Sequence, residues 1–165
     1  MPPISLLILY HCLTGGSAAM ARAALEGAQQ ESGVTSRLLS AAEATPDDLI
    51  AADGVIFACP ENLASMAGVM KDFFDRSYYP VLGKVEGRPY ATMICAGSDG
   101  EGAARQIARI ATGWRMKPIA EPLIICTHAQ TPEEILAPKT IAPDALAHCR
   151  DLGQAMAAGL SMGVV

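Results

Sequence analysis

Residues 4–28, ISLLILYHCLTGGSAAMARAALEGA, join a short apolar run to a segment with helical spacing. The run Ile4–Tyr10 is apolar on both faces, which is typical of a strand in a sheet that is covered on both sides. Apolar residues then recur at helical spacing from Met20 to Ala28. Between the two segments lies a turn, Thr14–Ser17, that holds two glycines and two hydroxyl side chains. A turn of this kind directs backbone N–H groups at one point, and therefore predicts a phosphate-binding loop.

The same alternation of apolar runs and helical segments continues along the chain. We expect strands at residues 54–59, 90–96 and 122–126, and a more polar edge strand at 34–40. Helix starts are indicated at Thr45 and Thr131, each followed by proline and acidic residues, and a capping box is expected from Ser98 to Glu101. Five strands alternating with helices predict a doubly wound α/β sandwich with a parallel sheet.

Ligands of such sheets bind beyond the carboxyl ends of the strands. Four polar, glycine-bearing or capped loops follow the expected strands, and these are the candidate site: HCLTGGS (11–17), PENLASMAG (60–68), AGSDGEG (96–102) and THAQTPEE (127–134).

Composition narrows the class of protein. The 165 residues are 51% hydrophobic, so a disordered chain is excluded, and we expect one domain over residues 1–165. A net charge of −5 without a basic run argues against a nucleic-acid partner. The N-terminal apolar run lacks a basic leader and the tail 152–165 is too short for a membrane span, so a cytoplasmic protein is expected. The five cysteines fit a reducing compartment and buried packing, and no metal site is expected.

The first loop does not match the common phosphate-binding motifs. A Walker loop needs a lysine where the chain has Gly16, and the G-x-G-x-x-G dinucleotide pattern is absent. A C-x5-R phosphatase site would use Cys12, but Ala18 stands in place of the arginine. What remains are the hydroxyls of Thr14 and Ser17 with backbone N–H groups, and no arginine or lysine is expected beside them. A capped turn without any ligand explains this loop, taken alone, equally well.

Three loops together resemble one family. Thr14, Gly15 and Ser17 match the flavodoxin phosphate loop, Thr/Ser-x-Thr-Gly-x-Thr/Ser, with Cys12 where a hydroxyl is usual. The segment DGVIFACPENLASMAGVMKDFFDR (53–76) is similar to flavodoxin-like NAD(P)H-dependent FMN and quinone reductases. Its matching residues are Pro60, Glu61, Ser65, Met66, Gly68 and 71–76, whereas Asn62 replaces an aromatic residue and Ala64 a glycine. The loop CAGSDGEG (95–102) resembles the second loop that contacts the isoalloxazine ring in this family.

The resemblance implies a three-layer flavodoxin-like sandwich with a five-stranded parallel sheet of order 2-1-3-4-5. It also implies non-covalent FMN, with its phosphate on the first loop and its ring between the other two. The expected cofactor-binding residues are His11, Cys12, Leu13, Thr14, Gly15, Gly16, Ser17, Pro60, Glu61, Asn62, Leu63, Ala64, Ser65, Ala96, Gly97, Ser98, Asp99, Gly100 and Gly102. Because the flavin carries the chemistry, no catalytic side chain is expected.

Two activities follow from the resemblance. One is an NAD(P)H-dependent oxidoreductase that reduces quinones, free flavin or similar small acceptors. The other is a flavodoxin-type one-electron carrier that docks on redox partner proteins, and a flavin-free scaffold is a third interpretation. The modest charge and Asn62 in place of a stacking ring favour the reductase.

Two further features lie outside the three loops. The tyrosine-rich segment 73–90 predicts self-association as a homo-dimer or a higher oligomer. Four basic residues near the third loop could meet a dinucleotide phosphate or a partner, or could form a solvated face: Arg105, Arg109, Arg115 and Lys117.

Overall fold

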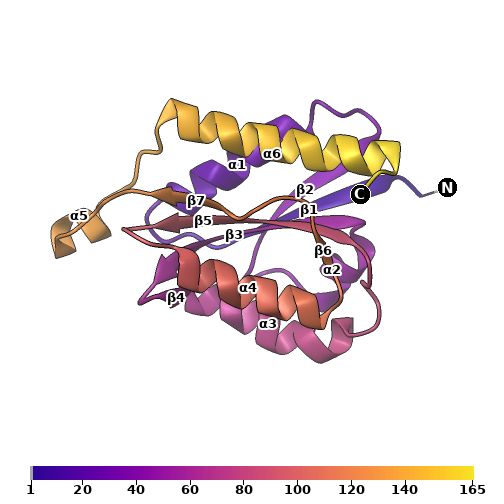
Figure 1. The fold of residues 1–165 in the computed structure, drawn as a ribbon, viewed down its shortest axis with the longest axis horizontal. Coiled ribbons are helices and arrows are strands. Elements are labelled where there is room, and N and C mark those ends of the chain that lie inside the picture. The colour runs from indigo at the N-terminus through magenta and orange to yellow at the C-terminus, as the bar shows by residue number, and fades with distance from the viewer. Residues whose placement is uncertain (1) are drawn as a thin grey trace.

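The computed structural model describes residues 2–165, in which helices cover both faces of a parallel sheet (Figure 1). The strands are β1 (Ile4–Tyr10), β2 (Val34–Ser40), β3 (Gly54–Asn62), β4 (Ser65–Met66), β5 (Pro89–Ala96), β6 (Lys117–Pro118) and β7 (Leu123–Cys126). The helices are α1 (Gly16–Ala28), α2 (Pro46–Ala51), α3 (Gly68–Val81), α4 (Glu101–Gly113), α5 (Pro132–Leu136) and α6 (Pro143–Met162). Helices α1 and α6 cover one face and α3 and α4 the other, while α5 lies apart at the edge of the molecule (Figure 1). Over residues 2–165, no helix combines the length and the apolar character that a membrane crossing requires.

The sheet has the strand order expected from the sequence. Strands β2, β1, β3 and β5 follow one another in parallel, and β6 and β7 both pair with β5 at the far edge. The fifth strand is therefore present but interrupted between Pro118 and Pro122, because proline cannot donate a hydrogen bond to a ladder. The two-residue β4 pairs antiparallel with the end of β3, which extends beyond the expected Cys59 to Asn62.

Each strand places side chains alternately in two cores. In β1, Leu7 and Leu9 join one core and Leu6 and Ile8 join the other, and all four are buried. The first core lies against α3 and α4 and contains the large aromatic side chains Phe57, Phe73, Phe74 and Trp114. The second core lies against α1 and α6 and consists mainly of alanine, methionine and branched aliphatic residues.

Helices α1 and α6 approach each other closely because both carry a glycine at the crossing. A Cβ atom on Gly27 would lie 1.9 Å from the carbonyl oxygen of Arg150, and one on Gly153 would lie 1.9 Å from the carbonyl oxygen of Ala24. Both distances are impossible for real atoms, so only glycine allows this backbone contact. The contact fixes α1, and with it the first loop, against the C-terminal helix.

The expected capping box at the start of α4 is wrong. Gly100, not Ser98, is the N-cap residue, and it has a left-handed backbone with φ of 92°. The carboxylate of Glu61 replaces the local cap, because it accepts hydrogen bonds from the N–H groups of Gly100 (2.9 Å) and Ala103 (3.1 Å). A side chain from another loop therefore satisfies two N–H groups at this helix start, which no local sequence pattern could reveal, while the N–H of Glu101 donates locally to Oδ1 of Asp99 (3.3 Å).

Candidate functional site

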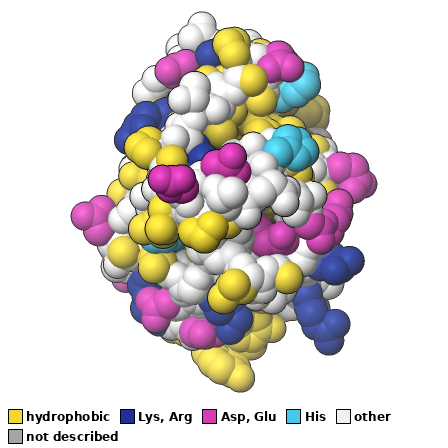
Figure 2. Space-filling model, turned by 90° about the vertical axis from the view of Figure 1, so that its left-hand side faces the viewer, with side chains coloured by type: hydrophobic (Ala, Val, Ile, Leu, Met, Phe, Trp, Pro, Cys, Tyr) yellow, Lys and Arg dark blue, Asp and Glu magenta, His cyan; other side chains and the backbone are white. Residues whose placement is uncertain are grey.

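Two adjoining hollows lie where β1, β3 and β5 end, at the edge of the sheet that faces the viewer in Figure 2. Their volumes are about 90 and 80 Å³. They share a set of lining residues that comes from four separate segments: Thr14, Pro60, Asn62, Cys95 and Ile135. The expected loops therefore do meet at one place, at the carboxyl ends of the strands.

The first loop ends in a helix N-terminus with free donors. Gly15 is the N-cap of α1 and has φ of 103°, a left-handed conformation that glycine adopts without strain. Its N–H group donates to Sγ of Cys12, at 3.0 Å. Within residues 2–165 the N–H groups of Gly16, Ser17 and Ala18 have no acceptor. Three free donors at the positive end of a helix dipole form a site for an anion.

The hydroxyl of Ser17 is buried without a partner. The residue is 2% exposed, and its Oγ atom makes no hydrogen bond within the described chain. An unpaired buried hydroxyl costs about 1–3 kcal/mol, and of the three such hydroxyls in the described chain, on Ser17, Ser36 and Ser77, only that of Ser17 borders a hollow at the strand ends. Ser17 lines the 80 Å³ hollow together with Gly16. The hydroxyl and the N–H groups therefore serve the same small volume.

The second loop is a strained hairpin between β3 and β4. Its two tip residues, Leu63 and Ala64, both have positive φ, at 53° and 62°, which costs each of them about 1–2 kcal/mol. Gln106 of α4 fixes the hairpin, because its Oε1 accepts from the N–H of Met66 (2.8 Å) and its Nε2 donates to Oγ of Ser65 (2.7 Å). Strain of this kind is concentrated at functional sites, where the surrounding contacts maintain it.

The third and fourth loops are joined by backbone hydrogen bonds. The N–H of His128 donates to the carbonyl oxygen of Gly97 (2.8 Å), and the N–H of Thr127 donates to that of Ala96 (2.9 Å). As a result Thr127 and Ala129 line the 90 Å³ hollow beside Gly97. The only sequence feature that placed this fourth loop at the candidate site was its position after the last expected strand.

Lys139 places a cation beside the first loop that was not expected from the sequence. Its backbone N–H donates to the carbonyl oxygen of Thr14 (2.8 Å), so the lysine lies directly beside the first loop, where no cation was expected. Its Nζ donates to the carbonyl oxygens of Glu134 (2.8 Å), Ile135 (2.8 Å) and Ala137 (2.6 Å), at the end of α5. A lysine so far along the chain can be assigned to this loop only from the tertiary structure.

The structure divides the expected site residues into two groups. Those that line the two hollows are Cys12, Leu13, Thr14, Gly16, Ser17, Pro60, Glu61, Asn62, Ala96 and Gly97. Those that do not are His11, Gly15, Leu63, Ala64, Ser65, Ser98, Asp99, Gly100 and Gly102. The residues that the expectation omitted are Cys95, Thr127, Ala129, Ile135, Leu136 and Lys139.

Burial shifts the pKa values of three titratable groups near the site, His11, Cys59 and Cys95, toward their uncharged forms. Burial lowers the pKa of His11, so its imidazole adds no positive charge next to the first loop. Burial raises the pKa of Cys59 to about 12 and that of Cys95 to about 11, so both remain thiols. In the part of the chain that the structure describes, no three histidine, cysteine or carboxylate side chains are grouped to hold a metal ion.

Comparisons with known proteins agree with this arrangement. The family model for NADPH-dependent FMN reductase matches residues 40–131, more than half of the chain. A flavodoxin from Aquifex aeolicus is 33% identical over 104 residues, which cover 62% of this chain and 54% of the relative. An NAD(P)H dehydrogenase (quinone) from Acidithiobacillus ferrooxidans is 35% identical over 92 residues, covering 44% of this chain and 46% of the relative. The chain thus spans about half the length of these curated relatives.

Solved structures show the same fold at low sequence identity. An archaeal flavodoxin has a TM-score of 0.77 at 19% identity, with 95% of this chain and 99% of the other covered. The flavodoxin, WrbA-like protein from Agrobacterium tumefaciens has a TM-score of 0.75 at 16% identity, with 96% and 98% covered. The flavodoxin-like fold expected from the sequence is confirmed.

Proposed function

Because the chain belongs to the NADPH-dependent FMN reductase family, we propose that it binds FMN and transfers electrons from NAD(P)H to a small acceptor. A quinone or free flavin fits this role, as the name of the Acidithiobacillus relative suggests. The observation that carries the proposal is the unpaired, buried hydroxyl of Ser17 beside the free N–H groups of α1. When bound, the flavin supplies hydride chemistry, and the protein supplies binding and orientation.

The phosphate of FMN fits the first loop. It would take hydrogen bonds from the N–H groups of Gly16, Ser17 and Ala18 and from the Ser17 hydroxyl, all of which lack partners in the described chain. Charge-assisted hydrogen bonds of this kind are worth about 1.5–3 kcal/mol each, roughly twice a neutral one. The set therefore suits an anion better than a neutral ligand.

Lys139 adds a positive charge that offsets the negative charge of the whole chain. The net charge of −5 repels an anion at long range, so a local cation beside the loop improves binding. Lys139 lines the 90 Å³ hollow with Thr14, and its ammonium group now binds three carbonyl oxygens of the α5 segment. We expect this side chain to turn partly toward a bound phosphate.

The ring of FMN requires a change in the α5 segment. The two hollows, at about 90 and 80 Å³, are smaller than the roughly 300 Å³ at which ligand pockets begin. Ile135 borders both hollows, and α5 buries none of its own residues. Few contacts hold this helix, so the entry of the ring would displace it at little cost. Asn62, whose exposed side chain borders both hollows, is available to hydrogen-bond the ring.

The absence of aromatic residues favours a reductase over a one-electron carrier. None of the residues that line the two hollows is aromatic, so no side chain there can stack on the flavin. One face of the ring is then open to nicotinamide or to an acceptor, as hydride transfer requires direct contact. A carrier remains the second candidate, because the Aquifex relative is named a flavodoxin.

The test is a titration with FMN followed by anaerobic mixing with NADPH. We expect saturable binding of FMN, seen as quenching of its fluorescence, and rapid loss of the flavin absorbance when NADPH is added. If the bound flavin stays oxidised with NADPH and NADH but is reduced by a redox protein, the carrier function is correct instead. A protein that does not bind FMN at all would contradict both.

A further inference from the structure

A third hollow lies on the outer side of the β3–β4 hairpin, next to α4. Its volume is about 520 Å³, within the range of pockets that hold small molecules. Four of its five lining residues lie on one face of α4, at helical spacing, and the fifth is at the tip of the hairpin: Gly102, Arg105, Gln106, Arg109 and Ala64. Neither of the two smaller hollows includes any of these residues.

The hairpin wall of this hollow is fixed to α4. A Cβ atom on Gly102 would lie 2.1 Å from the carbonyl oxygen of Ala64, so the hairpin backbone rests directly on the helix. Gln106 binds the same hairpin through Met66 and Ser65. The hollow is therefore a defined surface, and not an accidental gap between mobile parts.

Both arginines of the hollow lack an acidic partner. Arg105 and Arg109 are exposed, and within residues 2–165 neither forms an ion pair, although Glu101 lies one turn before Arg105. By contrast, Lys71 and Arg76 of α3 are both paired with aspartates. Basic side chains protrude at the lower right of Figure 2, the side on which α4 lies. Guanidinium groups bind phosphate through paired hydrogen bonds.

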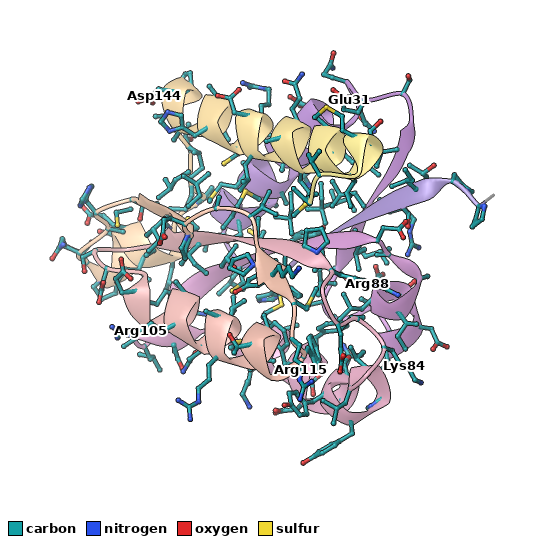
Figure 3. The ribbon with its side chains drawn as sticks, turned by 45° about the vertical axis from the view of Figure 1, so that its right-hand side comes forward. Glu31, Lys84, Arg88, Arg105, Arg115 and Asp144 are labelled. Carbon is teal, nitrogen blue, oxygen red and sulfur yellow. The ribbon has the colours of Figure 1, made fainter. Side chains whose placement is uncertain are left out.

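The other two basic residues of this region belong to a different surface. Arg115 follows the end of α4, and Lys117 belongs to β6, which pairs with the beginning of β5. They therefore lie near the amino ends of the strands, whereas the candidate site lies at the carboxyl ends. Figure 3 shows Arg105 and Arg115 at opposite ends of α4.

We infer that the hollow with Arg105 and Arg109 binds a phosphate of the nicotinamide dinucleotide, an inference that rests on the proposed reductase function. Only the width of the β3–β4 hairpin separates this hollow from the FMN site, because Glu61 and Asn62 line the 90 Å³ hollow and Ala64 lines the third hollow. A dinucleotide that crosses the hairpin tip would place nicotinamide at the flavin and a phosphate on the arginines. Leu63, which is 101% exposed at the tip, offers an apolar contact on this path.

The experiment compares an Arg105→Gln/Arg109→Gln double variant with wild-type protein and with Arg22→Gln. Arg22 is an exposed residue of α1 on the other face of the sheet, so it controls for the general loss of positive charge. The FMN-loaded proteins are titrated calorimetrically with NADP⁺ and NAD⁺, which bind without a redox reaction. FMN affinity is measured for each variant and is expected to stay the same.

We expect the double variant to bind NADP⁺ at least about tenfold more weakly, and the Arg22 control within about twofold of wild type. A loss for NADP⁺ alone identifies the 2′-phosphate, and an equal loss for NAD⁺ identifies the pyrophosphate; both support the inference. Unchanged affinity in the double variant, or an equal loss in the control, would overturn it.

The two proposals can fail separately. If the protein does not bind FMN, the proposed function is wrong, and adenosine 2′,5′-bisphosphate is then titrated into the protein alone. Binding that the double variant weakens keeps the phosphate site, and binding that it leaves unchanged, or no binding at all, removes it.

Discussion

Replacing Ser17 by alanine should change stability and FMN affinity in opposite directions. In the ligand-free chain the Ser17 hydroxyl is buried and unpaired, so it destabilises the fold. Alanine removes this hydroxyl and keeps the helix start. In the complex, the same hydroxyl would donate to the phosphate, and alanine would remove that hydrogen bond.

The magnitudes follow from the two environments. Removing an unpaired buried hydroxyl gains about 1–3 kcal/mol, less the packing contribution of one lost atom, and we take about 1 kcal/mol as the net gain. For a chain of this size, 1 kcal/mol raises the melting temperature by about 2–4 °C. Losing one hydrogen bond to a charged phosphate costs about 1.5–3 kcal/mol, which is a roughly 10- to 150-fold weaker affinity for FMN.

Thermal unfolding and FMN fluorescence quenching measure the two effects, and Ser77→Ala is the matched control. Ser77 of α3 is also buried, and its hydroxyl also lacks a partner in the described chain, but it lines neither hollow. Ser77→Ala should therefore raise the melting temperature and leave FMN affinity unchanged.

Two results would refute this reasoning. If Ser17→Ala bound FMN as well as wild type, the hydroxyl would not be a phosphate ligand, and the assignment of the first loop would lose its main support. If Ser17→Ala lowered the melting temperature of the ligand-free protein, the hydroxyl would have a partner that stabilises the fold.

Three other predictions concern charge, packing and reactivity. Lys139→Gln should weaken FMN binding about 5- to 10-fold and reduce its salt dependence, whereas Lys139→Arg should keep most of both; titrations at low and high salt measure this. Gly27→Ala should lower the free energy of unfolding by about 1–3 kcal/mol in a urea titration, because its Cβ would collide with the carbonyl oxygen of Arg150; an unchanged midpoint would contradict the close crossing of α1 and α6. At pH 8, Cys59 and Cys95 should resist iodoacetamide in the folded protein, because burial raises their pKa values to about 12 and about 11. Only about one in 10⁴ of the Cys59 side chains and one in 10³ of the Cys95 side chains are then thiolates, and both fractions rise with pH. Peptide mass spectrometry of the labelled protein checks this, and rapid labelling would count against it.

Those parts of the site whose conformation depends on neighbouring residues in the sequence were predictable. The turn at Thr14–Ser17 has a local signature, since glycines and hydroxyl residues between a strand and a helix form the same N-terminus in any context. The hairpin at Leu63–Ala64 does not have one, because these residues adopt a left-handed backbone that their side chains disfavour and that Gln106 maintains from α4. The cap of α4 by Glu61 is unpredictable for the same reason.

The sequence by itself determined the five main strands, the helices and their order, because burial on two faces and helical spacing are properties of neighbouring residues. The two-residue strands β4 and β6 exist only through their pairing with β3 and β5, and so were not expected. Only the tertiary structure decided that Lys139 lies beside the first loop. It likewise decided that Arg105 and Arg109 share a hollow while Arg115 lies at the other end of α4. The physical reason is that charge and hydrogen bonding act over a few ångströms in space, whatever the separation along the chain.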